Sequence, residues 1–217
     1  KRRPDPTCLP FEPQSCDVFV TEATFALPVF RHPDDRGEID KLLHSVALFP
    51  ERCHIVGVYA LGKCQRVLSL LRRQGYEEPV FLHGALASLV ALYERMGVPL
   101  GRVRPAVGAS REELRGKIVL VPPSAEAEPF ARRLPDPVVA MASGWMRVRQ
   151  RAKARGVELP LVISDHADWD ELRTTIAECA PSEVWVTHGA EDALVRQCAL
   201  DGVAARPLSL AGFEDEE

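Results

Sequence analysis

The sequence predicts an α/β protein built on mostly parallel sheets. Short apolar runs typical of strands alternate with longer stretches of helical periodicity along almost the whole chain of 217 residues. Strands that alternate with helices of this length form βαβ units, and the strands of such units are parallel. Some apolar runs also end close to an acidic residue or a histidine, which is where open α/β sheets bind their ligands.

The predicted elements follow in order along the chain. Strands are expected at the short apolar runs 17–21, 54–60, 79–82, 117–121, 137–141, 159–164, 183–187 and 205–208. Helices are expected at residues 35–48, 62–73, 85–96, 147–155, 169–179 and 190–201. The stretch 122–137, rich in proline and acidic residues, is expected to be an irregular loop, and the acidic tail 214–217 is expected to be disordered.

The composition is that of an ordinary globular protein, with 46% hydrophobic and 27% charged residues. No apolar run is long enough to cross a bilayer, and no secretory segment is visible, which predicts a cytoplasmic protein without a membrane partner. The net charge of −4 excludes a global basic field, so local patches would have to attract any nucleic acid. The six cysteines include no CxxC pair, so we expect reduced thiols and no cysteine-type zinc site.

Three polar residues stand at the ends of predicted strands, namely Glu22, His166 and His188. The two histidines flank one strand–helix–strand unit, whose right-handed crossover makes the strands parallel. Both imidazoles are therefore expected at the same edge of one sheet. Asp168 is well placed as a helix N-cap with Glu171 completing a capping box, which favours a structural role for it. A histidine after a strand is also often an ordinary hydrogen-bonded loop residue, so the pattern alone leaves both readings of the histidines open.

Two further segments are candidates for substrate binding through phosphate. Gly62 and Lys63 open a helix directly after a strand, and helix N-termini bind anions through their N–H groups. The alternative is a plain strand-to-helix turn, since the glycines are too sparse for a P-loop. A basic run that includes Arg147 and Arg149 and ends at Arg155 is either a solvated helix or a segment that contacts phosphate.

Five motifs resemble those of the metallo-β-lactamase/β-CASP nucleases in both order and spacing. Residues 20–25 (VTEATF) resemble motif A, 164–168 (SDHAD) motif B and 185–189 (WVTHG) motif C. Residues 60–65 (ALGKCQ) resemble a helix start of the β-CASP insert, and 138–144 (VVAMASG) resemble its late strand. The match extends along nearly the whole chain, and its opening is most similar to the bacterial ligase-associated DNA exonuclease branch, described as mRNA 3′-end processing factor-like.

The resemblance implies a partial metallo-β-lactamase αββα sandwich formed by residues 1–27 and 158–217, with a β-CASP α/β domain inserted at 28–157. The implied activity is metal-dependent hydrolysis of phosphodiester bonds by a DNA exonuclease in DNA repair, functionally associated with a DNA ligase. Two alternatives remain: an RNA-processing nuclease of the same class, and a non-catalytic α/β binding module.

The resemblance also implies a role for each residue at the strand ends. His188 matches a zinc ligand, and His166 matches a histidine that protonates the leaving oxygen. Glu22 matches the carboxylate that orients and charges this histidine. The complete family site holds two zinc ions, which activate a water and neutralise the phosphate.

The sequence departs from the family pattern in one large respect. The family's His-x-His-x-Asp-His signature and the aspartate that bridges the two metals are absent, which leaves His188 as the one matched ligand. The chain therefore resembles the C-terminal two-thirds of such a nuclease, and we expect it to be inactive alone. With most of the family's first sheet missing, apolar faces at Val18, Val20, Val162 and Val186 would be uncovered.

Overall fold

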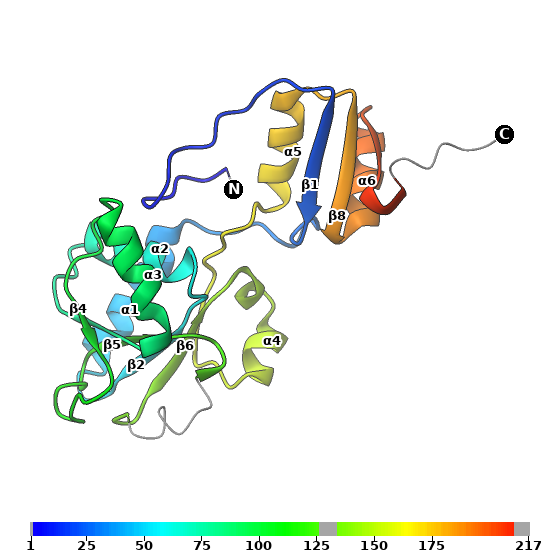
Figure 1. Ribbon diagram of the computed structural model, residues 1–217. Coiled ribbons are helices and arrows are strands. Elements are labelled where there is room, and N and C mark those ends of the chain that lie inside the picture. Colours follow the sequence, from blue (N-terminus) through cyan, green and yellow to red (C-terminus); the bar gives the residue numbers. More distant parts are fainter. Residues whose placement is uncertain (1, 126–133, 211–217) are drawn as a thin grey trace. The chain divides into compact units, whose positions relative to one another are not determined.

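The computed structural model describes residues 2–125 and 134–210 and divides into two compact units, each with its own sheet. The first unit comprises Lys1–Pro4, Pro10–Arg31 and His166–Glu217, and the second comprises Asp5–Leu9 and His32–Asp165. All strand pairs that the structure describes are parallel, which confirms the predicted α/β class (Figure 1).

The first unit contains a three-stranded sheet in the order β1-β8-β9. Its strands are β1 (Val18–Ala23), β8 (Glu183–Gly189) and β9 (Ala204–Pro207). Its helices are α5 (Trp169–Cys179) and α6 (Glu191–Leu200), and a 3-10 turn η4 (Leu208–Leu210) follows β9. Helix α5 directly precedes β8, and helix α6 connects β8 to β9, as crossovers between parallel strands require.

The helices of the first unit pack on one face of its sheet. Val184 and Val186 of β8 are fully buried in one cluster with residues of α5 and α6. On β1, Val18 and Val20 alternate with Phe19 of that cluster, and they are 38% and 51% exposed. The expectation of uncovered apolar residues is thus confirmed for these two valines. It is wrong for Val186, which points to the helix-covered face.

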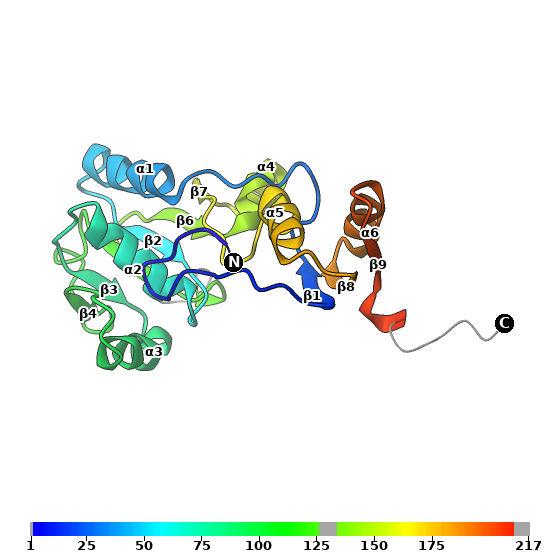
Figure 2. The same ribbon diagram turned by 90° about the horizontal axis from the view of Figure 1, so that it is seen from above.

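The second unit contains a six-stranded sheet in the order β4-β3-β5-β2-β6-β7. Its strands are β2 (His54–Gly57), β3 (Val80–Leu82), β4 (Val103–Pro105), β5 (Ile118–Val121), β6 (Val138–Ala142) and β7 (Leu159–Leu161). Its helices are α1 (Asp35–Leu48), α2 (Lys63–Arg73), α3 (Gly84–Arg95) and α4 (Arg149–Ala154), with a 3-10 turn η3 (Gly144–Arg147) before α4 (Figure 2).

Two apolar layers enclose this larger sheet. One layer joins α1, α2 and α3 to the strand residues that face them, such as Val56 and Leu120. The opposite face, which includes Ile55 and Val119, is covered by the segment after β4. Near β6, this layer is continued by α4 and η3, and it buries Val162 to 8% exposure, against the expectation of an uncovered face. Because both faces are covered, the strands are almost entirely buried, which is typical of parallel sheets.

The observed elements agree with the predicted ones in type and order, with one addition. The short edge strand β4 was not expected, and the basic run forms a 3-10 turn followed by the short helix α4 rather than one helix. The loop at 122–137 lies in part, and the acidic tail wholly, outside the described residues. None of the helices that the structure describes combines the length and apolarity needed to cross a bilayer.

The two units divide the chain at different positions from the boundaries that the family resemblance implies. The implied boundary at 157/158 assigns residues 159–161 to the sandwich, yet here they form β7 and pair with β6, with Ala140 opposite Leu159. Backbone pairing therefore attaches this segment to the larger sheet. The implied domains, and the αββα sandwich itself, stay predictions.

A buried arginine ties together distant segments of the second unit. The guanidinium of Arg66 on α2 is fully buried and donates to a carboxylate oxygen of Asp35 and to the carbonyl oxygen of Ser164. It also lies 3.3 Å from Asp165 Oδ1 and 3.9 Å from Asp5 Oδ2. One side chain thus links the N-terminal segment, the start of α1 and the segment after β7. Because the buried guanidinium is shielded from water, these carboxylates compensate its positive charge.

We predict that Arg66→Ala destabilises the protein by roughly 3–5 kcal/mol, because the buried carboxylate of Asp35 loses its cation. The free energy of unfolding would be measured in urea. Arg115→Ala is the matched control, since Arg115 pairs with Glu112 at the surface, and it should cost less than about 1 kcal/mol. Equal losses in both variants would contradict the structural role of Arg66.

Candidate functional site

The carboxylate of Glu22 lies at the carboxyl end of β1. Its Oε2 accepts a hydrogen bond of 2.6 Å from the backbone N–H of Thr24, and its Oε1 lies 3.3 Å from Nδ1 of His166. The predicted carboxylate–imidazole pair is therefore present, within the first unit. Parallel pairing places Glu22 opposite Thr187, the residue before His188. Glu22 and His188 thus lie at the ends of neighbouring strands, and His166 belongs to the same unit. The expectation that one βαβ crossover places both histidines at the same sheet edge is wrong, because β7, which precedes His166, pairs with β6 in the six-stranded sheet, whereas β8 pairs with β1.

Neighbouring residues of the first unit restrict the position of His166. Two residues later, Asp168 caps α5, and a capping box with Glu171 is complete, as the sequence predicts. Arg3 reinforces this cap by binding both carboxylates, at 3.0 Å to Glu171 and 3.1 Å to Asp168. The imidazole also meets the buried ring of Phe25 edge-on, with centroids 5.9 Å apart. It nevertheless remains 52% exposed, so it is accessible from solvent.

Two opposing effects act on the pKa of Glu22. Burial is the largest and would raise it, but the hydrogen bonds from His166 and Thr24 outweigh burial, so the pKa lies below its ordinary value of 4.5. Glu22 is therefore ionised at neutral pH. The ionised form stabilises the fold above the ordinary pKa, and this contribution is lost as the pH falls through the lowered value.

His188 occupies an unusual backbone position at the end of β8. The pairing with β1 runs from Glu22 opposite Thr187 to Ala23 opposite Gly189, so His188 is an extra residue in a β-bulge. Its φ is 55°, in the left-handed region that residues with a Cβ seldom adopt. Such conformations are frequent at functional sites, where the surrounding structure compensates their cost.

The side chain of His188 is exposed, and its Nδ1 lies 2.9 Å from the hydroxyl oxygen of Thr187. Within the described part of the chain, Nε2 has no protein partner. The bulge therefore presents this nitrogen to solvent at the same sheet edge as Glu22. Its neighbour Gly189 has a φ of 106°, and a Cβ there would lie 2.3 Å from the carbonyl oxygen of Ala23. The turn after β8 thus requires glycine.

The donor set of this unit does not by itself fit a zinc ion. Residues 2–125 and 134–210 contain no group of three or more His, Cys, Asp or Glu side chains arranged to hold a metal. Catalytic zinc sites use three protein ligands and an open position. His188 is one candidate donor, whereas Glu22 and His166 bind each other. The predicted role of His188 as a ligand stays a prediction.

Lys63 in the second unit is directed inward. Its side chain is 3% exposed, and its Nζ donates to the carbonyl oxygen of Ile163 at 2.7 Å and lies 3.1 Å from Asp165 Oδ2. Gly62 precedes it as the N-cap of α2, with a φ of 81°. The ammonium thus neutralises a carboxylate of its own unit. The predicted contact of Gly62 and Lys63 with substrate stays a prediction.

The motif comparison missed Arg66, because this residue lies one turn beyond the helix start that the motif covers. It stands three residues after Lys63, hence on the same side of α2, and the two cations bind consecutive residues of the segment Ile163–Asp165. Its helical neighbours Lys63, Ser69 and Leu70 are mostly polar, so no local pattern indicated its burial. This cluster holds the chain up to the residue that precedes His166.

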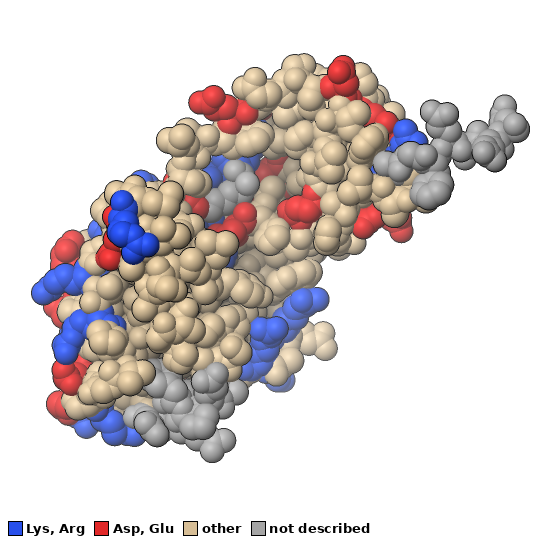
Figure 3. Space-filling model, viewed as in Figure 1, with Lys and Arg blue, Asp and Glu red and all other residues tan. Residues whose placement is uncertain are grey.

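Arg147 and Arg149 lie on the surface of the second unit. Lys and Arg side chains gather over α4 in Figure 3. Both arginines are exposed, and no carboxylate pairs with either of them among the described residues. Their exposure is compatible with the predicted role in substrate binding, which no contact in the structure tests.

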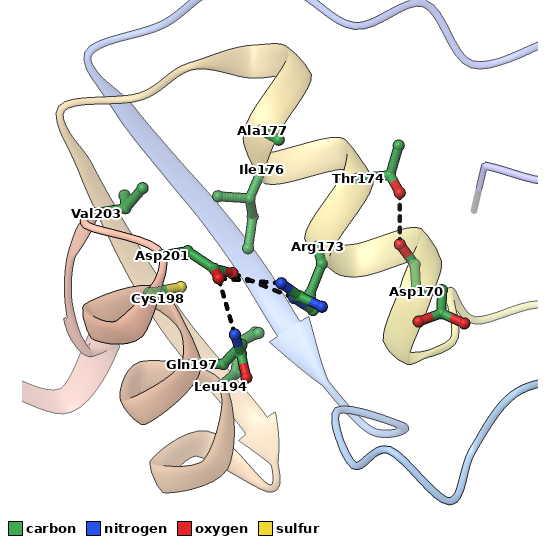
Figure 4. Close-up of a pocket in the computed structure, with 10 residues that line it drawn as sticks. All are labelled: Asp170, Arg173, Thr174, Ile176, Ala177, Leu194, Gln197, Cys198, Asp201 and Val203. Carbon is green, nitrogen blue, oxygen red and sulfur yellow. Dashed lines mark hydrogen bonds and ion pairs between the residues drawn. The ribbon is translucent and has the colours of Figure 1, made fainter.

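A hollow of about 600 Å³ in the first unit contains none of the predicted site residues. It lies between α5 and α6 and is lined mainly by apolar side chains, among them Ile176 and Leu194 (Figure 4). Its charged side chains are paired, since Arg173 binds Asp201 at 3.0 Å and Asp170 binds Arg31 at 2.7 Å. Its one thiol, Cys198, is buried, and burial raises its pKa, which makes it a poor nucleophile. The strand-end residues therefore remain the better candidate.

Together these features define an α/β protein with two parallel sheets and a carboxylate–imidazole pair at the edge of the smaller one. No protein-family model matches the chain. A probable DNA ligase from Opitutus terrae is similar to it, with 28% identity over 182 residues. This match covers 80% of the chain but 17% of the ligase, so the chain spans a small part of that relative. A crystal structure of a protein of unknown function from Enterococcus faecalis V583 shares 16% identity, with a TM-score of 0.45, over 82% of this chain and 47% of that one.

We predict that His166→Ala raises the pKa of Glu22. Burial, the largest influence on this carboxylate, acts upward, and the variant removes the hydrogen bond that opposes it most. Carbon-detected NMR titration of the Glu22 carboxyl would measure the change. The exposed Glu112 provides an internal reference that should not move. An unchanged pKa of Glu22 would show that the pair is not formed in solution.

We also predict that Gly189→Ala destabilises the protein by more than about 3 kcal/mol, the upper cost of a strained backbone position. The additional loss arises because the new Cβ would collide with the backbone of Ala23 and Thr24. Gly202→Ala is the matched control, since Gly202 has a φ of 78° and no atom lies within 4 Å of the position that its new methyl group would take. The control should lose only about 1 kcal/mol. The free energies of unfolding of both variants would be measured in urea. Their difference separates the effect of the collision from that of the left-handed backbone conformation.

Proposed function

We propose that this chain is part of a phosphodiesterase that hydrolyses nucleic acid, with DNA as the favoured substrate. The observation that carries the proposal is the solvent-accessible pair of Glu22 and His166, with His188 on the neighbouring strand end. Ligands of α/β sheets bind at the carboxyl ends of the strands, which is where these side chains lie. An exonuclease acting in DNA repair is the more specific form of the proposal.

The pair suits a proton donor to a leaving oxygen. Glu22 contacts Nδ1 of His166, which orients the ring and makes Nε2 the nitrogen that would face a substrate. As water attacks phosphorus and the P–O bond to the leaving group breaks, the proton on Nε2 would pass to the departing oxygen. The attacking water loses one proton to solvent, and solvent returns one proton to the histidine, which is neutral after the step. Glu22 acts as a positioning residue.

Zinc remains part of the proposal only through His188. Its exposed Nε2 could ligate a metal while Nδ1 keeps its contact with Thr187, the arrangement that metal-binding histidines commonly adopt. A zinc site would need at least two more protein ligands, and the described residues contain no ready group of three. We therefore derive no reaction step from the metal.

The relative in Opitutus terrae supports DNA as the polymer. That protein is a probable DNA ligase, and the matched part is 17% of its length. A domain of this kind beside a ligase would be suited to trimming DNA ends before they are joined. RNA remains the alternative substrate, since neither Glu22 nor His166 distinguishes the two polymers.

A non-catalytic α/β binding module is the second candidate function. It is favoured by the absence of a three-residue metal-ligand group in the described part of the chain. The exposed arginines of α4 would still serve such a module, because phosphate contacts require no catalysis. Zinc content and turnover of the full-length gene product would distinguish the module from the nuclease.

We predict different effects for the two histidines in the full-length gene product. His188→Ala should lower bound zinc, measured by elemental analysis, because the site loses a ligand. His166→Ala should retain zinc but lose roughly 10²–10⁴-fold in the rate of DNA hydrolysis, the usual contribution of a general acid. Similar zinc loss in both variants would contradict this division of roles. His83→Ala is the control, since this histidine caps α3 in the second unit.

A further inference from the structure

A small crevice lies at the carboxyl ends of β2 and β6 in the second unit. These strands are neighbours, but the chain leaves them in opposite directions: β2 leads to β3 on one side, and β6 leads to β7 on the other. Their connections therefore diverge and leave the strand ends uncovered. This is the topological switch point, where open α/β sheets bind ligands.

The lining of this crevice is aromatic and basic. Tyr59 follows β2, Ser143 and Trp145 follow β6, and Arg151 and Arg155 extend from α4 and its C-cap. The remaining lining residues are methionines, and no carboxylate is among them. The enclosed space is about 30 Å³, roughly the volume that one water molecule occupies in the liquid. It can admit part of a phosphate group, whereas a larger ligand would lie partly on the surface.

No carboxylate among residues 2–125 and 134–210 pairs with the two arginines of the crevice. The guanidinium of Arg151 lies 3.8 Å above the centre of the Trp145 ring, and Arg155 donates to the sulfur of Met141 at 3.4 Å. Both partners hold the guanidinium groups in place without neutralising them. Elsewhere in the protein, Arg66, Arg173 and other arginines bind carboxylates. An arginine fixed over an aromatic ring presents its N–H groups to an anion with phosphate-like geometry.

The basic character continues along the polypeptide on either side of Arg151. The stretch 144–156 contains five basic residues and no acidic one, in a chain whose net charge is −4. Arg147, Arg149 and Lys153 are exposed, and no ion pair engages them among the residues that the structure describes. At every-second spacing these charges surround the short helix instead of forming one stripe. The local excess of positive charge still favours a polymer with many phosphates over a single anion.

Tyr59 adds a surface for a base. Its side chain is 54% exposed at the mouth of the crevice, although aromatic rings of this size are usually well covered. Every nucleobase has a face that can stack on such a ring. In a duplex these faces are covered by neighbouring base pairs, so an exposed aromatic beside phosphate-binding arginines favours an unpaired strand.

We propose that this crevice binds a nucleotide of single-stranded nucleic acid, with phosphate on Arg151 and Arg155 and the base stacked on Tyr59. The proposal rests on the proposed function, from which it takes nucleic acid as the ligand. It adds that the protein recognises a single strand. It concerns binding alone and requires neither metal nor turnover.

The test is fluorescence anisotropy with the purified chain, in the presence of EDTA so that no hydrolysis occurs. The probes are labelled oligothymidylate and oligouridylate of roughly a dozen nucleotides, within the usual site size, and a duplex of the same length. We expect the single strands to bind more tightly than the duplex. The two single-stranded probes distinguish DNA from RNA, and either one bound in preference to duplex supports the proposal.

Variants assign the binding to the crevice. Tyr59→Ala should weaken single-strand binding about 5- to 150-fold, the range that loss of one base stack gives, whereas Tyr59→Phe, which keeps the ring, should bind as the natural chain does. Arg151→Ala should reduce the slope of log affinity against log salt by about 0.7, the effect of one lost phosphate contact on a single strand. Arg95→Ala removes an exposed charge from α3, outside the crevice lining, and should change affinity much less. Thermal unfolding of each variant checks that the fold is kept.

Three results would overturn the proposal: equal affinity for duplex and single strand, full binding by Tyr59→Ala, or competition by polyglutamate as effective as that by nucleic acid, which would indicate an acidic peptide partner. A failure of the proposed function would be distinguishable from a failure of this binding proposal. Intact single-strand binding without hydrolysis by the full-length gene product would leave the crevice in place and remove the nuclease.

Discussion

The parallel pairing of β1 with β8 is the constraint on which the candidate site depends. The two strands are far apart in the chain, yet their register places Glu22 opposite Thr187 and leaves His188 as the extra residue of a bulge. The bulge directs this histidine to solvent in a left-handed conformation, and it is possible only because Gly189 follows, where a side chain would strike the backbone of Ala23. A shift of the register by one residue would turn Glu22 to the other face of the sheet. The sheet therefore determines the site through backbone hydrogen bonds more than through the side chains themselves.

Cations in this protein have two distinct environments. Lys63 and Arg66 are buried, and carboxylates and carbonyl oxygens compensate their charges, so that they stabilise the segment just before His166. Arg151 and Arg155 are held by an aromatic ring and a thioether, which immobilise the guanidinium groups without neutralising them. The buried cations are thus neutralised by their partners, whereas the partners of Arg151 and Arg155 leave their charge available. A chain of net negative charge can therefore still carry a local basic surface.

The Glu22–His166 pair illustrates how a site can be prepared by competing effects. Burial acts to raise the pKa of the carboxylate, but the imidazole and the backbone of Thr24 lower it further than burial raises it. The histidine remains half exposed while Phe25 and the cap of α5 restrict its position. An accessible ring with a fixed orientation is what proton transfer to a substrate requires. The conclusion that it performs such a transfer remains part of the proposed function.

Much of the fold was predictable from local sequence, because strands and helices of this protein follow their hydrophobic periodicity closely. The helices 35–48 and 169–179 were predicted with their observed ends, and the N-caps Asp34 and Asp168 define where they begin. The strand-end positions of Glu22 and His188 were also predictable, since they need only the order of the elements. That of His166 was not, because β7 already ends at Leu161 and pairs in the larger sheet. The edge strand β4 was missed because three residues carry too little periodicity.

Other features depend on contacts between residues remote in sequence, and only the tertiary structure decided them. The inward direction of Lys63, the carboxylates around Arg66 and the stacking of Arg151 on Trp145 follow from packing, which no local pattern encodes. The same is true of the attachment of β7 to the larger sheet and of the bulge at His188. Sequence by itself determined most of the segments that form strands and helices, and that Glu22 and His188 end two of the strands, because those preferences act over a few residues. The tertiary structure decided which of those polar groups meet, because that depends on strand order and register.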